Sequence, residues 1–185
     1  MKLNLGCGNN KKDGYINCDK YLACNPDLVM DCEIFPWAFS DNEIEEIVFI
    51  HSLEHMGAAE DIFLNIIKEV YRVCKSNALV RIHVPHPRHD NFLGDPSHVR
   101  VITPQLLTLF SKKNNLHWKE LGASNTPFAF YLDVDFEMRN VVTVLEQNYL
   151  ELLNNKKITV DELEQKIKEN NNIVSEYQII LEVIK

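Results

Sequence analysis

Five short apolar segments, each bounded by turn residues, divide the first 85 residues of the chain. Near-continuous apolar runs such as residues 47–50 are typical of strands buried on both faces of a parallel sheet. Between the fourth and fifth segments, apolar residues recur with a period of 3.6, which predicts a helix over residues 61–74. This alternation predicts an α/β fold. The five predicted strands are KLNLG (2–6), YINCD (15–19), DLVMD (27–31), IVFIH (47–51) and ALVRIHVP (78–85).

The last third of the chain has a different pattern. Thr103 precedes a proline and is expected to cap a short helix. Residues 128–145 and 176–185 are rich in aromatic and β-branched side chains and are expected to contain strands. Between them, Thr159 and Glu162 have the spacing of a capping box. Two late strands separated by a helical insertion predict a β-hairpin at the edge of the sheet.

Composition limits the class of protein. A chain of 185 residues with 45% apolar residues fits one globular domain. No run approaches the roughly 18 apolar residues of a membrane span, and no export signal is visible. The five cysteines form no CxxC pair, so we expect reduced thiols in a cytoplasmic protein. The net charge of −8 disfavours broad nucleic-acid binding.

Charge is distributed unevenly along the sequence. No Lys or Arg lies between Lys20 and Lys68, whereas basic residues dominate from Lys68 to Lys119. This asymmetry would suit a cationic cofactor at one end of a site and an anionic substrate at the other. Two merely solvated surfaces would produce the same pattern, and the sequence leaves both readings open.

A glycine turn and two acids follow consecutive predicted strands. The first strand runs into a glycine bend (residues 6–8, Gly-Cys-Gly), where glycine permits positive φ and close approach of a ligand to the main chain. Asp19 ends the second strand, where a carboxylate can accept both ribose hydroxyls of an adenosine. Asp31 ends the third strand in the same way. Together these residues predict an adenosine site.

Residues 1–110 resemble the class I S-adenosylmethionine-dependent methyltransferases of the small type 11 group. The resemblance is carried by LGCG (5–8), GYINCD (14–19), MDCEIFPW (30–37) and FIHSLEHM (49–56). It implies a Rossmann-like, doubly wound, mostly parallel seven-stranded sheet of order 3-2-1-4-5-7-6 with the last strand antiparallel. It also implies one domain over 1–185, with a cofactor-binding core and histidine loop in 1–119 and an edge hairpin with a helical insertion in 120–185.

S-adenosylmethionine is the cofactor that the resemblance implies, with S-adenosylhomocysteine as its product. The glycine bend would lie against the amino-acid moiety, Asp19 would bind the ribose, and Asp31 with Cys32 would frame the adenine. The full set of expected cofactor-binding residues is Leu5, Gly6, Cys7, Gly8, Asp19, Lys20, Asp31, Cys32 and His51.

Two departures from the family pattern affect this site. Only 11 residues separate Gly8 from Asp19, too few for a full helix, and nothing precedes the first strand, where many relatives have a covering helix. The cofactor site would therefore be open, or covered by the late helices or by a second chain in a homodimer. The short spacing, with Lys11 at the third glycine position, also disfavours a dinucleotide oxidoreductase.

A polar segment with three histidines, the histidine loop (residues 85–102), follows the fifth strand, where ligands collect in α/β sheets. Methyl transfer needs alignment of the reactants, and a base only if the acceptor must lose a proton. The candidate catalytic residues are His89 and Asp90, with His51 behind them. The candidate substrate-binding residues are His55, His86, Arg88, His98 and Arg100.

Other interpretations of the histidine loop stay open. Its histidines could hold the loop together through backbone hydrogen bonds. Metal binding by the loop histidines and Asp90 is a weaker alternative, because HxxH in a proline-rich loop is not the helical HExxH motif, and we predict no metal.

The function predicted from the sequence is methyl transfer from S-adenosylmethionine to a small or medium-sized acceptor, which would be anionic if the basic segment faces the site. The alternatives are a non-catalytic binding protein of the same fold and a metal-dependent hydrolase built on the histidines of residues 86–98.

Overall fold

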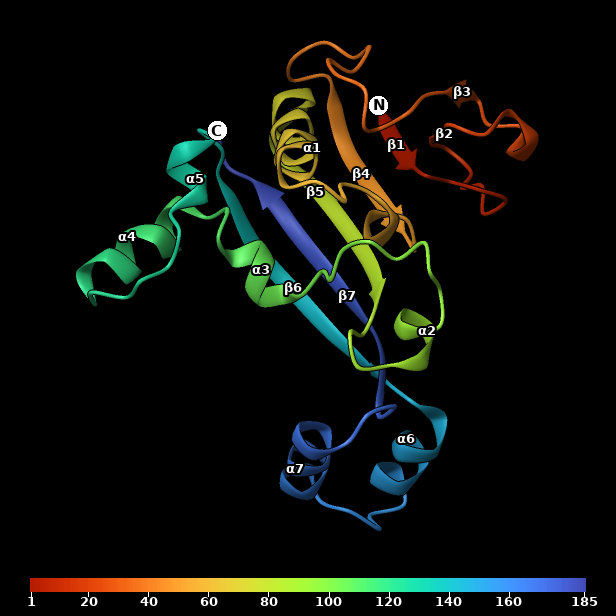
Figure 1. Ribbon diagram of the computed structural model, residues 1–185, viewed down its shortest axis with the longest axis vertical. Coiled ribbons are helices and arrows are strands. Elements are labelled where there is room, and N and C mark those ends of the chain that lie inside the picture. The colour runs from red at the N-terminus through yellow and green to blue at the C-terminus, as the bar shows by residue number, and fades with distance from the viewer.

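The computed structural model covers residues 1–185 and contains one seven-stranded sheet of order β3-β2-β1-β4-β5-β7-β6 (Figure 1). Strands β1 to β5 are parallel, and β7 is antiparallel to both of its neighbours. The predicted strand order and the reversed last strand are confirmed. The strands are β1 (Lys2–Leu5), β2 (Ile16–Asp19), β3 (Leu28–Val29), β4 (Ile44–Ile50), β5 (Cys74–Pro85), β6 (Phe136–Leu145) and β7 (Val174–Val183).

Only some of the helices were predicted from the sequence. The helix expected over residues 61–74 is α1 (Glu60–Val73), and two 3-10 turns, η1 (Leu22–Cys24) and η2 (Leu53–His55), follow β2 and β4. None of the helices combines the length and apolarity needed to cross a membrane. The remaining helices are α2 (Asp90–Leu93), α3 (Pro104–Thr108), α4 (Lys112–Glu120), α5 (Phe128–Tyr131), α6 (Gln147–Asn154) and α7 (Val160–Glu169).

The late hairpin carries the predicted helical insertion. Strands β6 and β7 pair along their length, and α6 and α7 lie beyond the end of the sheet (Figure 1). The capping box at the start of α7 is present, because the Thr159 hydroxyl accepts from the amide of Glu162 and the Glu162 carboxylate accepts from the amide of Thr159 at 2.8 Å. Local sequence signals were sufficient to predict this unit.

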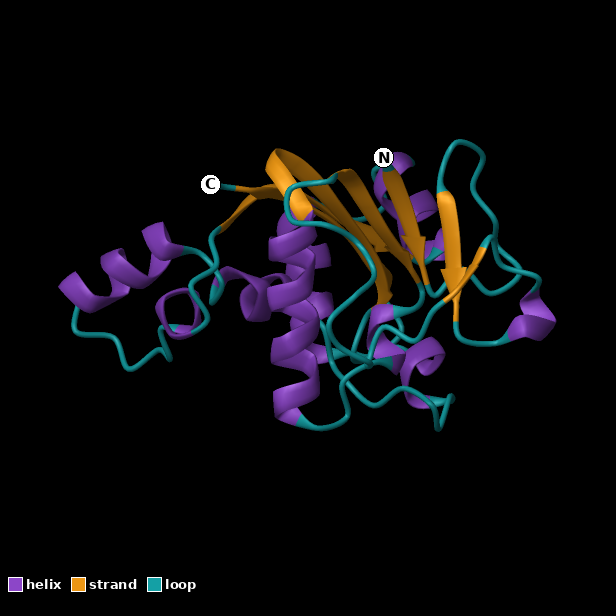
Figure 2. Ribbon diagram, turned by 90° about the horizontal axis from the view of Figure 1, so that it is seen from above, coloured by secondary structure: helices purple, strands orange, loops and turns teal.

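The core lies on one face of the sheet, where α1 packs (Figure 2). Phe63, Ile66 and Val70 of α1 are buried against alternate strand residues such as Phe49 and Ile82. Alternate residues of a strand point to the same face, and on β5 the ones beneath α1, Val80 and Ile82, are apolar and buried. The burial of this face accounts for most of the hydrophobic stabilisation.

The opposite face of the sheet is largely polar, which corrects the expectation that the strands are buried on both faces. On β5, Val80 and Ile82 are buried, whereas Arg81 and His83 between them are partly exposed. Glu46 of β4 accepts from Lys2 at 3.0 Å and from Arg81 at 2.6 Å across this face. Ion pairs of this kind suit a surface in contact with water, and no long helix connects β1, β2 and β3 to cover it.

A loop takes the place of the helix between β1 and β2. The buried side chain of Asn4 donates to the carbonyl of Asn10 and to the Oδ1 of Asn17, both at 2.9 Å. The same Oδ1 accepts from the amide of Lys12 at 2.8 Å. Two buried asparagines therefore satisfy the backbone of this loop and fix its return to β2. The sequence spacing predicted the loop but not the asparagine pair.

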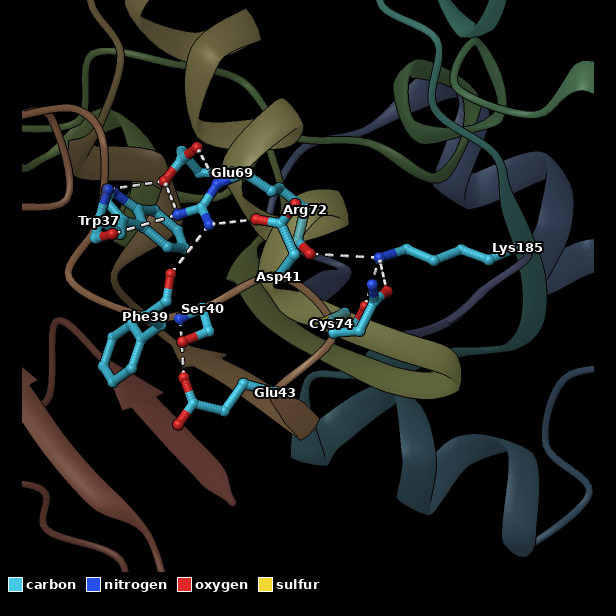
Figure 3. A network of polar contacts seen from close by, with 10 residues as sticks. Trp37, Phe39, Ser40, Asp41, Glu43, Glu69, Arg72, Cys74 and Lys185 are labelled. Carbon is cyan, nitrogen blue, oxygen red and sulfur yellow. Dashed lines mark hydrogen bonds and ion pairs between the residues drawn. The ribbon is translucent and has the colours of Figure 1, made fainter.

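The segment between β3 and β4 is likewise irregular, and α1 holds it through Arg72 (Figure 3). Arg72 makes two hydrogen bonds of 2.7 Å to the carboxylate of Glu69 and also donates to the carbonyls of Trp37 and Phe39. Its Nη1 lies 2.7 Å from Asp41, and Glu69 accepts from the Trp37 amide at 2.7 Å. The bidentate Arg72–Glu69 pair thus supplies hydrogen-bond partners to the backbone of this segment, which has no helical hydrogen bonds of its own.

Replacing Arg72 with alanine is expected to lower the free energy of unfolding by about 2–4 kcal/mol, because Glu69 stays largely buried with only the Trp37 amide as partner. Urea denaturation measures the change. Arg139→Ala is the matched control. Arg139 pairs with Glu137 and Glu182 on an exposed strand, so its replacement should lower the free energy of unfolding far less. Equal losses in both variants would contradict the role of Arg72 in holding the loop.

Candidate functional site

A cleft of about 290 Å³ opens where β1, β2 and β4 end. The carboxyl ends of parallel strands are the usual ligand site of an α/β sheet. Eight of the residues singled out from the sequence line this cleft: Gly6, Gly8, Asp19, Lys20, Asp31, Cys32, His51 and His55. Six others that were not predicted also line it: Tyr21, Met30, Glu33, Ser52, Met56 and Ser97.

The glycine bend forms one wall of the cleft. Gly6 has φ of +67°, and a β-carbon there would lie 2.6 Å from the Cβ of Ser52 and 2.9 Å from the Cε of Met56. The Ser52 hydroxyl donates to the carbonyl of Leu5 at 2.7 Å and holds the bend against η2. Only glycine allows this close approach. Leu5 and Cys7 are buried next to the bend and do not line the cleft.

Asp19 is the central carboxylate of the cleft. One of its oxygens accepts from the amide of Gly8 at 2.8 Å, and the other accepts from the amide of Tyr21 at 2.9 Å. Each carboxylate oxygen has a second lone pair, so Asp19 can still accept hydrogen bonds from a ligand. The side chain is only 8% exposed, and the two amides fix its orientation. Asp19 therefore connects the glycine bend to the loop that follows β2. Its remaining lone pairs could accept hydrogen bonds from the two hydroxyls of a diol.

A second wall follows β3. The Asp31 carboxylate accepts from the amide of Glu33 at 2.9 Å, and Trp37 donates its indole N–H to the carbonyl of Cys32 at 3.1 Å. Glu33 accepts from the amide of Gly57 at 2.6 Å, which ties this wall to the segment after η2. Burial raises the pKa of the Cys32 thiol, which therefore stays protonated. Cys32 is a packing residue here and not a nucleophile.

The first half of the histidine loop turns away from the cleft. The Nε2 of His89 lies 3.0 Å from Glu146, and its Nδ1 accepts from the amide of Asn91 at 3.0 Å. Arg88 donates to the carbonyls of Ile167 and Lys168 at the end of α7. The catalytic role predicted for His89 and Asp90 therefore has no geometric support. The bond to Asn91 makes His89 the N-cap of α2, whereas Glu146 is 57 residues away and could not be predicted as a partner.

His86 and Arg100 also have structural contacts. The His86 ring lies 5.0 Å from that of Tyr177, and burial lowers the pKa of His86. Arg100 donates to the carbonyl of Gly57 at 2.8 Å, and its guanidinium stacks over Phe63. Neither Arg88 nor Arg100 lines the cleft, so the prediction of an anionic acceptor has no support from these two residues.

The fold is shared with many solved structures. A S-adenosylmethionine-dependent methyltransferase from Archaeoglobus fulgidus matches 98% of this chain and 85% of its own, with a TM-score of 0.65 and 17% identity. A second from Methanosarcina mazei matches 99% and 92%, with a TM-score of 0.54 and 14% identity. The chain has the fold of the S-adenosylmethionine-dependent methyltransferases.

The methyltransferase fold alone does not define the reaction. The [4+2]-cyclase SpnF has it too and matches 99% of this chain and 75% of its own, with a TM-score of 0.56 and 13% identity. No protein-family model and no curated protein matches the sequence. The function must therefore be argued from the residues of the cleft.

His51 and His55 occupy the end of the cleft formed by β4 and η2 of the methyltransferase fold. His51 has φ of +50°, and its Nε2 lies 2.9 Å from the Glu176 carboxylate of β7. Behind them lies Glu54, which no sequence argument singled out although it is part of the FIHSLEHM segment. Its backbone carbonyl accepts from the amides of Val99 and Arg100, so η2 anchors the second half of the histidine loop.

Proposed function

We propose that this protein transfers a methyl group from S-adenosylmethionine to a small or medium-sized acceptor. The observation that carries the proposal is the Asp19 carboxylate, held at the cleft by the amides of Gly8 and Tyr21. The methyltransferase fold gives this position its context, because the cleft lies at the carboxyl ends of the strands.

The residues of the cleft fit the parts of this cofactor. Asp19 would bind the ribose hydroxyls, and the glycine bend would lie against the amino-acid moiety. Met30 and Cys32 would pack against the adenine, with Asp31 beside them. Most of the cleft residues lie in the segment without Lys or Arg between Lys20 and Lys68, and three acids, Asp19, Asp31 and Glu33, line the cleft against the single Lys20. This balance of charge suits a cationic ligand.

S-adenosylmethionine supplies a methyl group on a sulfonium, and a lone pair of the acceptor takes that carbon while the carbon–sulfur bonding pair returns to sulfur, which leaves S-adenosylhomocysteine. The chain's own contribution is alignment and exclusion of water. Where the acceptor must lose a proton, we place the base at His51 rather than at His89, because His51 lines the cleft and Glu176 orients its ring.

Two further expectations remain proposals. The five free thiols support a cytoplasmic setting. The cleft is partly open to solvent, which is compatible with a homodimer that covers it.

Thermal unfolding with added ligands tests the proposed function. S-adenosylmethionine or S-adenosylhomocysteine at about 100 times the dissociation constant should stabilise the fold by about 2.7 kcal/mol and raise Tm by roughly 5–10 °C. NAD⁺ at the same concentration is the control and should cause no shift, because the glycine bend lacks the third glycine and helix of a dinucleotide site. A shift with NAD⁺ alone, or none with any of these ligands, would refute the proposal.

A further inference from the structure

Glu54 is a buried carboxylate without a hydrogen-bond partner. The residue is 1% exposed, and neither of its carboxylate oxygens accepts a hydrogen bond. A buried polar group in this condition costs free energy, which the charges of nearby histidines offset only in part. The carboxylate therefore requires a partner that the chain itself does not supply.

Histidines face this carboxylate, but at a distance too great for a hydrogen bond. The Nδ1 of His51 lies 3.8 Å from the Oε1 of Glu54, and the Nε2 of His98 lies 4.0 Å from the same oxygen. One ligand atom each from Glu54, His55 and His98 can be chosen so that all three lie within 4.8 Å of one another. The rings of His55 and His98 are 4.6 Å apart between centroids.

The hydrogen bonds of the two rings determine which nitrogens are free. The Nδ1 of His98 lies 2.9 Å from the carbonyl of Phe92. The Nδ1 of His55 lies 3.3 Å from the carbonyl of Ser97 and 3.0 Å from the Ser97 hydroxyl, whose own proton goes to Asp95. Because a carbonyl only accepts, each Nδ1 carries the proton and each Nε2 keeps its lone pair. A ring N–H on a backbone carbonyl is the usual support for a histidine that binds metal through its other nitrogen.

We propose that Glu54, His55 and His98 form a binding site for a divalent transition-metal cation such as Zn²⁺. Two histidines and one carboxylate are a recurrent ligand set for zinc and for non-haem iron, and they leave coordination positions open. This set differs from the histidine-loop set considered from the sequence, because His86 and His89 point elsewhere. The ligand atoms must draw together to about 3.3 Å on a tetrahedral ion.

The site adjoins the cleft, because His55 and Ser97 are part of the cleft lining. If the proposed function holds, on which this step rests, the cation would bind an acceptor hydroxyl or thiol and lower its pKa. The acceptor's proton would pass to His51 and from there to solvent, and its oxygen or sulfur would then be the nucleophile toward the methyl carbon. The proposed substrate class is therefore an alcohol, phenol or thiol.

The test is metal titration of the untagged full-length protein after treatment with a chelator. Calorimetry with Zn²⁺ should show one equivalent bound, and Co²⁺ should give visible d–d absorption. Glu54→Gln and His98→Gln should each weaken Zn²⁺ binding at least 10-fold, whereas His117→Gln, an exposed histidine of α4, should leave it unchanged. Glu54→Gln should also raise Tm of the metal-free protein, since it removes a buried unpaired acid.

Absence of Zn²⁺ binding, or equal binding by wild type, Glu54→Gln and His98→Gln, would overturn the proposal. Titration with S-adenosylhomocysteine on the same samples separates this inference from the proposed function. Cofactor binding without metal binding refutes the metal site alone, and metal binding without cofactor binding refutes only the methyltransferase proposal.

Discussion

Replacing Gly6 with alanine is expected to lower the free energy of unfolding by about 2–5 kcal/mol. An alanine in the left-handed region costs about 1–2 kcal/mol, and Gly6 has φ of +67°. The new methyl group would lie 2.6 Å from the Cβ of Ser52, which adds about 1–3 kcal/mol of overpacking. Urea denaturation measures the loss, and binding of S-adenosylhomocysteine should be lost as well because the bend must shift.

Gly122→Ala is a closely matched control for this change. Gly122 has the same φ of +67°, but a β-carbon there would have no heavy atom within 4 Å. It should therefore show only the backbone cost of about 1–2 kcal/mol. If the two variants lose the same stability, the packing of the glycine bend against Ser52 and Met56 is not what restricts position 6 to glycine.

Replacing Asp19 with alanine is expected to weaken binding of S-adenosylhomocysteine roughly 10- to 150-fold. The change removes hydrogen bonds from the ribose hydroxyls to a charged group, which contribute about 1.5–3 kcal/mol. It also frees the amides of Gly8 and Tyr21, which Asp19 now holds. Calorimetric titration of wild type and variant gives the ratio of dissociation constants.

Asp27→Ala controls for the general loss of a carboxylate beside β2, since Asp27 directly precedes the neighbouring strand β3. Asp27 accepts from the amide of Asn17 at 2.9 Å, much as Asp19 accepts from backbone amides, but it does not line the cleft. Cofactor affinity should be unchanged in this variant. A loss shared by both variants would show that the β2 loops, rather than the Asp19 carboxylate, determine the affinity.

The early strands and the location of the cleft were predictable because their signals are local, whereas the strand order was implied by the family resemblance. Each of the first three strands ends in, or is closely followed by, a glycine or an acid, and parallel strands bring their carboxyl ends together. Gly6, Asp19 and Asp31 therefore line one cleft, as expected from their positions in the chain. The capping box of α7 was equally visible, since both of its residues lie within one helical turn.

The histidine loop was not predictable because its partners are distant in sequence. His89 pairs with Glu146 and Arg88 with the end of α7, contacts that exist only once the late hairpin has returned beside β5. The polar face of the sheet was missed for a similar reason. Residues such as Arg81 alternate with buried valine and isoleucine, and only the absence of a covering helix places them in contact with water.

The environment of Glu54 was also not predictable from the sequence. The LEH segment was part of the family resemblance, yet nothing in the sequence shows that its carboxylate is buried without a partner. That property depends on the second half of the histidine loop, whose Val99 and Arg100 amides bind the Glu54 carbonyl and bring His98 beside it. Only the three-dimensional contacts reveal the cluster.

The central claim is that the cleft between the glycine bend and Asp19 holds the nucleoside of S-adenosylmethionine. A crystal structure of the protein with S-adenosylhomocysteine tests it most directly. The account predicts both ribose hydroxyls within hydrogen-bond distance of the Asp19 carboxylate and the adenine beside Asp31 and Cys32. A ligand bound elsewhere, or in this cleft with its ribose away from Asp19, would contradict it.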